Sequence, residues 1–477
     1  MAIKIYNTLT RKSEQLIPIE PEKVRIYICG PTVYDYFHIG NARPFILFDI
    51  FRRYLKYRGF EVQFVTNLTD IDDKIIKKAN EEKISTAEVA EKYIKAFFDD
   101  TKKLGIREAD KYPKATENIP EIIQLIEKLI ENGLAYQING DVFYSVTKFR
   151  GYGKLSGKNI EQLESGARVE VDSRKNDPLD FALWKAAKPG EPFWESPWGK
   201  GRPGWHIECS VMSMKYLGES FDIHAGGVDL VFPHHENEIA QSEGATGKPF
   251  VKYWMHNGFL NIEGEKMSKS LGNFFTAREI MEKYHPAVIR MFFLLKHYRS
   301  PINFSEERIL EAQSALERIV TTLENIDLLI KEQESEIEDG APSLAESINE
   351  LKQEFVNEMD DDFNTAGAMS KIFDLVKEAN LILTKNQIPP EDILSLIKIK
   401  EAIEEFNGFL EILFYRETRK SLGKDDALIK ILIDVRNKLR SEKQWALADY
   451  IRDELDSAGF ELKDHPQKTT WRIKLTQ

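Results

Sequence analysis

The chain has 477 residues, of which 42% are hydrophobic and 30% are charged, and its formal net charge is -12. This composition is typical of globular domains and excludes a disordered or fibrous protein, and the length predicts two to four domains. No apolar run reaches the ~18–20 residues of a membrane helix, and residues 1–7 lack the apolar core of a secretory signal. We therefore expect a cytoplasmic protein without membrane contact. We separately expect the protein to be a monomer. The negative charge argues against nucleic-acid binding over the whole surface, but it allows a local basic face.

The first predicted elements form a strand–helix–strand unit. Residues 24–30 predict a short buried strand that ends in a Gly-Pro turn. Apolar residues at helical spacing predict a helix over residues 43–57, with Pro44 in its first turn, and residues 61–67 predict the next strand. Such a unit builds a parallel sheet that binds nucleotides at the carboxyl ends of its strands. The predicted fold class is therefore α/β.

The sequence pattern changes between about residue 112 and residue 200, where the strand–helix alternation stops. This segment contains one amphipathic helix over residues 119–131, a short strand over residues 141–144, and then a stretch rich in Gly, Pro and Trp. Because the α/β pattern resumes after it, we interpret this segment as an insertion into the sheet domain.

The α/β pattern resumes with a helix that begins near Trp205. A strand over residues 221–227 and a helix from about residue 234 to residue 243 follow. From about residue 276 onward the pattern predicts mainly helices, and the end of the chain, from about residue 427, pairs two helices with a polar tail.

Two motifs are suited to handling phosphate. His38-Ile39-Gly40-Asn41 lies between the first strand and its helix, where His38 and Asn41 can both donate hydrogen bonds and Gly40 leaves room for an adenine or a ribose. Lys266-Met267-Ser268-Lys269-Ser270 forms a cationic loop that can neutralise pyrophosphate while a carboxylate attacks the α-phosphate of ATP. Either motif alone is consistent with a helix cap or a solvated basic turn. Together and in this order they predict adenylate chemistry.

A possible metal site combines both cysteines of the chain with two residues of a later helix. Cys29 ends the first strand, Cys209 lies in the helix that begins near Trp205, and His234 and Glu238 share a helical face. Strand ends of a doubly wound sheet converge on one crevice, and two thiolates with an imidazole and a carboxylate favour Zn²⁺. Two buried apolar thiols are the other interpretation. The alternative ligands on the later helix are His235 and Glu236.

The chain resembles a known enzyme family in these motifs. The two phosphate motifs resemble the HIGH and KMSKS signatures of class I aminoacyl-tRNA synthetases, with Asn41 in place of the second His. Asn still donates a hydrogen bond, but it cannot carry charge. The resemblance covers nearly the whole chain and is closest to the cysteinyl-tRNA synthetases of the bacterial type. The segments that carry it are Cys29–Asp35, Asn67–Lys74, Trp205–Ser210 and Phe232–Glu238.

This resemblance implies ATP-dependent activation of L-cysteine to cysteinyl-adenylate and its transfer to the 3′ end of tRNA(Cys), with Mg²⁺ accompanying ATP. It also implies one Zn²⁺ per chain that binds the substrate thiolate. A pocket that judges shape alone separates cysteine from serine weakly, by ~10–200-fold, whereas a soft metal prefers sulfur to oxygen. The implied zinc ligands are Cys29, Cys209, His234 and Glu238.

The same resemblance implies roles for further residues. The implied catalytic residues are His38, Asn41, Lys266 and Lys269, and Gly40 and Ser268 join them in binding ATP. The implied substrate contacts are Thr69, Asp70, Trp205 and Asp229. The implied tRNA contacts are Trp471 and Arg472, because an aromatic ring beside a basic group suits unstacked anticodon bases.

The implied fold is a Rossmann-type parallel sheet split by an inserted domain and followed by helical tRNA-binding domains and a small anticodon-binding domain. The predicted boundaries are residues 1–111 and 201–275 for the two halves of the catalytic domain, 112–200 for the insertion, 276–305 for a stem-contact region, 306–420 for a helical bundle and 421–477 for the anticodon-binding domain.

Two other functions compete with this prediction. A cysteine ligase that loads an amino sugar would activate cysteine in the same way, but the long helical end argues against it. A non-catalytic, RNA-binding relative of a synthetase would not need the complete lysine loop and metal set.

Overall fold

The computed structural model divides the chain into two compact units. The first unit comprises Met1–Phe274, Phe293–Ser305 and Glu346–Leu375, and the second comprises Phe275–Phe292, Glu306–Ala345 and Val376–Gln477. The structure describes residues 2–158, 174–262, 265–266, 275–333, 340–416, 423–458, 460–464 and 469–473. Within these residues, no helix combines the length and apolar character that crossing a membrane requires.

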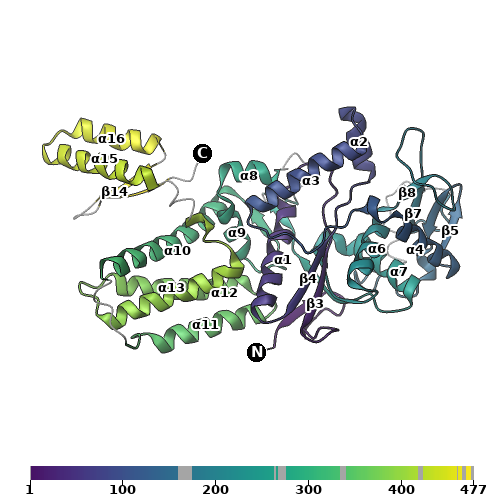
Figure 1. Cartoon of the computed structure of the whole chain (residues 1–477), viewed down its shortest axis with the longest axis horizontal. Helices are drawn as coiled ribbons and strands as arrows, with labels where there is room; N and C mark the ends of the chain where they lie inside the picture. The colour runs from purple at the N-terminus through teal and green to yellow at the C-terminus, as the bar shows by residue number, and fades with distance from the viewer. Residues whose placement is uncertain are drawn as a thin grey trace. The chain divides into compact units, whose positions relative to one another are not determined.

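A four-stranded parallel sheet in the order β10-β9-β3-β4 forms the centre of the first unit (Figure 1). Its strands are rich in Val, Ile and Phe, and most of their side chains are buried, as both faces of a parallel sheet require. Because β3 lies between β4 and β9, the loops that follow these three strands meet at one edge. This confirms the predicted parallel sheet. The strands are β3 (Lys23–Ile28), β4 (Glu61–Thr66), β9 (Phe221–Gly227) and β10 (Val251–Asn257).

The helix after β3, α1 (Ile39–Tyr57), begins four residues before the predicted start at residue 43. His38 has extended backbone angles (φ -86°, ψ 161°), and its side chain accepts a hydrogen bond from the backbone N–H of Asn41, so His38 is the N-cap. Pro44 therefore lies inside the helix and not in its first turn. The prediction started too late because the apolar periodicity begins only after the small residues of the first turn.

The inserted segment forms an antiparallel sheet in the order β5-β6-β7-β8 beside α4 (Ile119–Glu131). α4 and β6 have the predicted bounds, and their apolar side chains share one core with Trp184. Figure 1 shows α6 and α7 between this segment and the parallel sheet. The strands are β5 (Ala135–Ile138), β6 (Asp141–Tyr144), β7 (Phe181–Ala186) and β8 (Gly201–Pro203).

Two helices flank β9 along the chain, α6 (Trp205–Leu217) and α7 (Glu236–Thr246). α6 begins at Trp205 as predicted. α7 begins two residues after the predicted start, because the preceding turn Val231–His235 contains Phe232 in a non-helical conformation (φ -138°, ψ 131°). This turn places two consecutive histidines beside the carboxyl edge of the sheet.

Further strands and helices complete the chain before residue 306. They are β1 (Lys4–Asn7), β2 (Lys12–Gln15), α2 (Asp73–Glu82), α3 (Thr86–Lys103), β11 (Leu260–Ile262), β12 (Glu265–Lys266), α8 (Ala277–Lys283), α9 (Pro286–Leu294) and β13 (Ile302–Phe304).

The chain from residue 306 onward is mainly helical, as predicted. Near its end, two helices and a hairpin enclose a small apolar cluster of their own, which includes Ile429, Ile433, Leu455 and Leu462. The elements are α10 (Glu306–Glu332), α11 (Ala345–Asp360), α12 (Thr365–Leu383), α13 (Pro390–Leu410), α15 (Gly423–Ser441), α16 (Trp445–Ser457), β14 (Phe460–Asp464) and β15 (Thr469–Ile473).

Candidate active site

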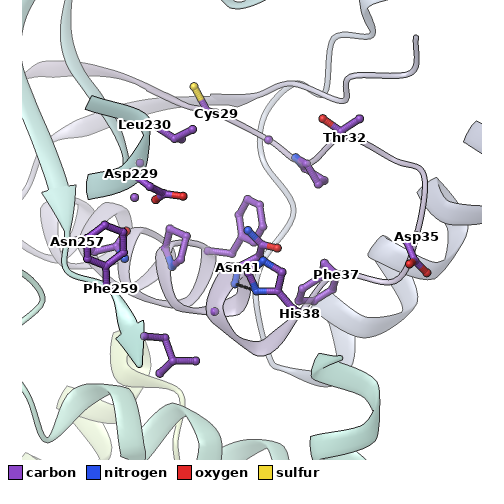
Figure 2. A pocket seen from close by; sticks show the side chains of 18 of the residues that line it. Cys29, Thr32, Asp35, Phe37, His38, Asn41, Asp229, Leu230, Asn257 and Phe259 are labelled. Atoms are coloured by element: carbon purple, nitrogen blue, oxygen red, sulfur yellow. Dashed lines mark hydrogen bonds between the residues drawn. The ribbon is translucent and has the colours of Figure 1, made fainter. Parts of the chain in front are cut away.

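A cavity of about 300 Å³ opens at the carboxyl edge of the parallel sheet (Figure 2). The loop after β3, the start of α1, the turn after β9 and the segment after β10 line it. Open α/β sheets bind their ligands at this edge, so the position agrees with a nucleotide site. The predicted site residues that line the cavity are Cys29, His38, Gly40, Asn41, Trp205 and Asp229.

The hydrogen bond at the start of α1 fixes the protonation of His38. Its Nδ1 accepts from the backbone N–H of Asn41 at 3.1 Å. A ring nitrogen that accepts carries no proton, so the neutral imidazole holds its proton on Nε2 and is a donor there. Figure 2 shows His38 and Asn41 together at the cavity. The cavity thus contains the donor that a phosphate oxygen needs, beside the positive end of α1.

A cluster of metal-ligating side chains lies at the Cys29 end of the cavity. One ligand atom each from Cys29, Cys209, His234 and Glu238 lies within 4.8 Å of the other three. Cys29 Sγ is 3.8 Å from Cys209 Sγ and 3.6 Å from Glu238 Oε1, and His234 Nε2 is 3.1 Å from the same oxygen. Zinc bonds of 2.0–2.3 Å in a tetrahedron separate ligand atoms by roughly 3.3–3.8 Å. The donor types and spacing of the predicted set therefore fit Zn²⁺.

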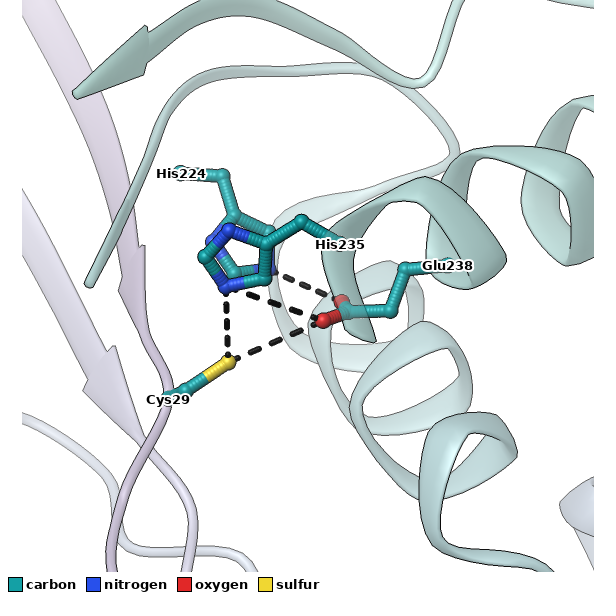
Figure 3. Close-up of side chains that lie close together, drawn as sticks. All are labelled: Cys29, His224, His235 and Glu238. Carbon is teal, nitrogen blue, oxygen red and sulfur yellow. Dashed lines mark hydrogen bonds and ion pairs between the residues drawn. The ribbon is translucent and has the colours of Figure 1, made fainter. Parts of the chain in front are cut away.

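A second, overlapping group shares Cys29 and Glu238 with the first. It adds His224 and His235, and its ligand atoms also lie within 4.8 Å of one another (Figure 3). His235 Nε2 is 3.3 Å from Cys29 Sγ, and His224 Nε2 is 2.8 Å from Glu238 Oε2. The first group has two sulfur donors and the second has one, so the first is the better match for zinc.

Burial keeps the imidazoles of this cluster neutral. It lowers the pKa of His224 to about 3 and the pKa of His234 and His235 well below the usual value. Burial also raises the pKa of the Glu238 carboxyl and of the Cys29 thiol well above their usual values. Neutral imidazoles have a lone pair for a metal, and a cation beside Cys29 and Glu238 would favour their charged forms.

A hydrogen-bond network connects the sequence neighbours of Cys29 and Cys209, namely Gly30 and Glu208, through Asn67 and Thr69. The backbone N–H of Gly30 donates to Asn67 Oδ1 at 2.7 Å, and a Cβ on Gly30 would lie 1.6 Å from the carbonyl oxygen of Asn67, so only glycine fits between the two strand ends. Asn67 Nδ2 donates to Thr69 Oγ1, which donates to Glu208 Oε2 at 3.0 Å. Burial raises the pKa of Glu208 well above its usual value. This network holds the end of β3 against α6.

Of the four predicted substrate contacts, two line the cavity and two do not. Trp205 and Asp229 line the cavity, and the Trp205 ring stacks on His234 with ring centroids 4.4 Å apart. Thr69 and Asp70 are buried outside the cavity lining, Thr69 in the network near the cysteines and Asp70 in hydrogen bonds with the backbone and hydroxyl of Thr116. Their geometry indicates a supporting position, whereas Trp205 and Asp229 can reach a ligand.

The lysine motif is only partly described. Lys266 ends the short hairpin β11–β12, and Ser268 and Lys269 lie outside the described residues. The hairpin is anchored close to the other motif, because the buried guanidinium of Arg43 in α1 donates to the carbonyls of Gly258 (2.6 Å) and Phe259 (3.1 Å), just before β11. The fold thus brings the backbone around the two motifs together, although ~225 residues separate them in sequence.

The predicted tRNA contacts lie in the C-terminal hairpin. Trp471 is half-buried in β15, and its ring packs on Phe460 with centroids 5.6 Å apart. The backbone of Arg472 pairs with Glu461, and its side chain lies outside the described part of the chain. Trp471 therefore belongs partly to the apolar cluster of this small subdomain.

Sequence reasoning missed the histidines that surround the metal cluster. His206 Nδ1 is 2.9 Å from His234 Nδ1, and His256 Nε2 is 2.8 Å from His235 Nδ1. Burial lowers the pKa of both His206 and His256 to about 3. A signal was present, because five of the nine histidines of the chain lie between residues 206 and 256. Thr32 and Lys74, which also line the cavity, lie within the segments that carry the family resemblance, but no role was predicted for them.

Comparisons with known proteins agree with this geometry. Residues 15–314 match the family model described as tRNA synthetases class I (C) catalytic domain, and residues 354–414 match the DALR domain. A cysteine–tRNA ligase of Carboxydothermus hydrogenoformans is 52% identical over 474 residues, which covers 98% of this chain and 100% of that protein. The cysteine–tRNA ligases of Anoxybacillus flavithermus and Thermococcus onnurineus are also 52% identical, and each comparison covers 99% of this chain and 100% and 99% of those proteins.

Solved structures with much lower identity share the fold. Methionyl-tRNA synthetase of Mycobacterium tuberculosis in complex with methionyl-adenylate has a TM-score of 0.60 at 13% identity, covering 82% of this chain and 91% of that one. A putative arginyl-tRNA synthetase of Campylobacter jejuni has a TM-score of 0.56 at 14% identity, covering 82% and 93%. The fold is therefore that of class I synthetases, and by the full-length identity the chain belongs to the family of cysteine–tRNA ligases.

Proposed function

We propose that this enzyme converts ATP and L-cysteine into cysteinyl-adenylate and pyrophosphate, and transfers the cysteinyl group to the 3′ end of tRNA(Cys), with zinc selecting cysteine over serine. One observation carries the proposal. A single cavity has the start of α1 along its wall and the Cys29 end of the sulfur-containing cluster at its other side. A substrate that spans the cavity can present phosphate to the first and a thiol to the second.

The residues at the start of α1 act on the phosphates. His38 donates from Nε2, Asn41 donates from its exposed side-chain amide, and the helix terminus adds a positive potential. Lys266, Ser268 and Lys269 supply cationic and hydroxyl groups as pyrophosphate leaves. Mg²⁺ accompanies ATP as its counter-ion. The reaction needs no covalent intermediate on the enzyme, because the substrate carboxylate is itself the nucleophile.

The residues of the cluster act on the side chain of the amino acid. Cys29, Cys209, His234 and Glu238 would hold one Zn²⁺, which when bound supplies a soft Lewis acid that prefers a thiolate to a hydroxyl. Trp205 stacks on His234 and offers an apolar surface at that end of the cavity. Asp229, in the turn after β9, has a carboxylate that can receive the ammonium group of the amino acid.

Metal content measured together with cysteine-dependent ATP–pyrophosphate exchange tests this function. We expect about one zinc per chain, exchange with cysteine and, at equal concentration, far less with serine. Chelation should weaken cysteine binding more than ATP binding. Equal losses for both substrates would show that the metal is structural, and the absence of cysteine-dependent exchange in the metal-loaded enzyme would overturn the proposed activity itself.

A further inference from the structure

A second hollow in the first unit has a basic lining. This basic groove has a volume of about 570 Å³, and among the described residues its lining contains four exposed cations and no acidic residue. The groove lies between the turn after β1 and a later segment, residues 150–158, which follows β6 in the chain. Its lining residues are Leu9, Arg11, Arg150, Gly151, Tyr152, Gly153, Lys154, Gly157 and Lys158.

Most of the positive charge in the basic groove is not neutralised by the protein. Lys154 forms an ion pair with Glu243. Within the described part of the chain, the guanidinium groups of Arg11 and Arg150 have neither an ion pair nor a hydrogen bond, and Lys158 Nζ lies 4.1 Å from the centre of the Phe232 ring. In a chain whose net charge is -12, a concave surface of this kind attracts an anionic ligand.

The groove depends on a close tertiary contact between Arg11 and Gly157. Gly157 has φ +68°, and a Cβ built on it would lie 1.6 Å from Nη2 of Arg11. The guanidinium of Arg11 therefore occupies the space that a side chain at position 157 would need. The contact holds Arg11 against a turn that is remote in sequence, so the fold places this cation.

The basic groove borders the metal cluster of the cavity. Thr8, next to the groove residue Leu9, places its Oγ1 2.8 Å from His256 Nδ1, and His256 is hydrogen-bonded to His235. His235 in turn lies 3.3 Å from Cys29 Sγ. On the other side, Phe232 under Lys158 directly precedes Pro233 and the predicted ligand His234. The buried side chains of His256 and His235 thus lie between the groove and Cys29.

We propose that the basic groove binds phosphates of the single-stranded 3′ end of tRNA while that end approaches the adenylate. This inference rests on the proposed function, since the 3′ end is the part of the tRNA that must reach the cavity. Single strands bind in grooves where cations follow the backbone and aromatic rings offer stacking surfaces, and Tyr152 is among the residues that line this groove. A double-stranded stem would instead require contacts across a wide minor groove.

Binding measurements with intact tRNA and with tRNA trimmed of its single-stranded 3′ end test the proposal. The variants are Arg11→Gln and Arg150→Gln, alone and combined, and the control is Lys77→Gln, an exposed cation of α2 outside the groove. We expect the combined variant to bind intact tRNA roughly tenfold more weakly, and the slope of log Kd against log salt to fall by about 0.7 for each lost contact. Lys77→Gln should change neither.

Trimming the tRNA gives the sharper comparison. If the groove binds the 3′ end, the trimmed tRNA binds wild type and the combined variant equally, because the same contact is already lost. If trimming and the substitutions each lowered tRNA affinity independently, the proposal would be overturned. It would also be overturned if the combined variant bound intact tRNA as tightly as Lys77→Gln does. A parallel fall in cysteine-dependent pyrophosphate exchange would also overturn it, since that would indicate damage to the cavity. Wild type without such exchange refutes the proposed function instead.

Discussion

His38 carries two tasks on its two ring nitrogens. Nδ1 caps α1 by accepting from the N–H of Asn41, and Nε2 is the nitrogen that we propose donates to the ligand. An alanine at this position would remove both, so its effect could not be assigned to either.

Replacing His38 with Asn separates the two tasks. Asn is among the preferred N-cap residues and can accept from the same N–H, but it lacks the second donor. We expect the free energy of unfolding to stay within about 0.5 kcal/mol of wild type, and cysteine activation to slow by ~10²–10³-fold, as for loss of one transition-state donor. Urea unfolding and pyrophosphate exchange provide the two measurements. Activation within threefold of wild type would limit His38 to capping.

The two overlapping ligand groups differ at Cys209 and His224. If zinc is held by the group with two sulfurs, Cys209→Ser should weaken zinc binding by more than ~100-fold, because a direct ligand is lost. His224→Asn should cost ~10–100-fold at most, the range for a residue that orients a ligand, since His224 contacts Glu238. Competition with a calibrated chelator measures both affinities. The reverse order would assign the site to the group shown in Figure 3.

At the scale of elements, Arg43 fastens α1 to two other segments. Its Nη1 donates to Gly258 and Phe259, and its Nη2 donates to the carbonyls of Tyr298 (3.0 Å) and Ser300 (2.7 Å). Burial lowers the pKa of Arg43 to about 10, which leaves it charged at neutral pH. The segment before the lysine motif is thereby fixed to the helix that carries the first motif.

Arg43→Met should therefore be strongly destabilising. It leaves several buried carbonyls without a donor, at about 1–3 kcal/mol for each unsatisfied group, so we expect a total loss of about 3 kcal/mol or more. Lys56→Met is the matched control, because Lys56 is an exposed cation of the same helix and should change stability by less than about 0.5 kcal/mol. Urea unfolding followed by circular dichroism compares the two. Similar stabilities would show that solvent replaces the guanidinium.

Elements with a clear apolar period were predicted well. The helix Ile119–Glu131 and the strands Asp141–Tyr144 and Phe221–Gly227 have the predicted bounds, because packing and periodicity agree there. The starts of α1 and α7 were wrong by four and two residues. Both starts belong to the site, where an unusual histidine cap and a non-helical Phe232 replace the ordinary signals of a helix start.

The site itself was only partly predictable. The chain has only two cysteines, which suggested that they share one site, and the i, i+4 spacing of His234 and Glu238 suggested two further ligands. The contacts of His206 and His256 depend instead on how α6 and β10 pack against the turn Val231–His235, which no local pattern reports. Thr69 illustrates the same limit, since its burial against Glu208 is a tertiary property.

At the scale of the whole molecule, the C-terminal subdomain of α15, α16, β14 and β15 has an apolar cluster of its own. A chain that ends at Lys420 lacks this subdomain. We expect it to keep cysteine-dependent pyrophosphate exchange and to lose tRNA affinity by on the order of 10²-fold, because one of two linked contacts with the same tRNA is gone. A gel-shift titration beside the exchange assay measures both. Unchanged tRNA affinity would refute the predicted role of residues 421–477.

Pro44 removes one backbone hydrogen bond near the start of α1. A residue at this position normally donates its N–H to the carbonyl four residues earlier, and proline has none to give to Gly40. The carbonyl of Gly40, a residue of the cavity lining, therefore lacks the N–H that it would normally accept from within the helix. The first turn of α1 thus combines unpaired amide hydrogens with one carbonyl that has no partner at position 44. Substituting the proline would restore the N–H at position 44 while leaving every side chain of the motif in place.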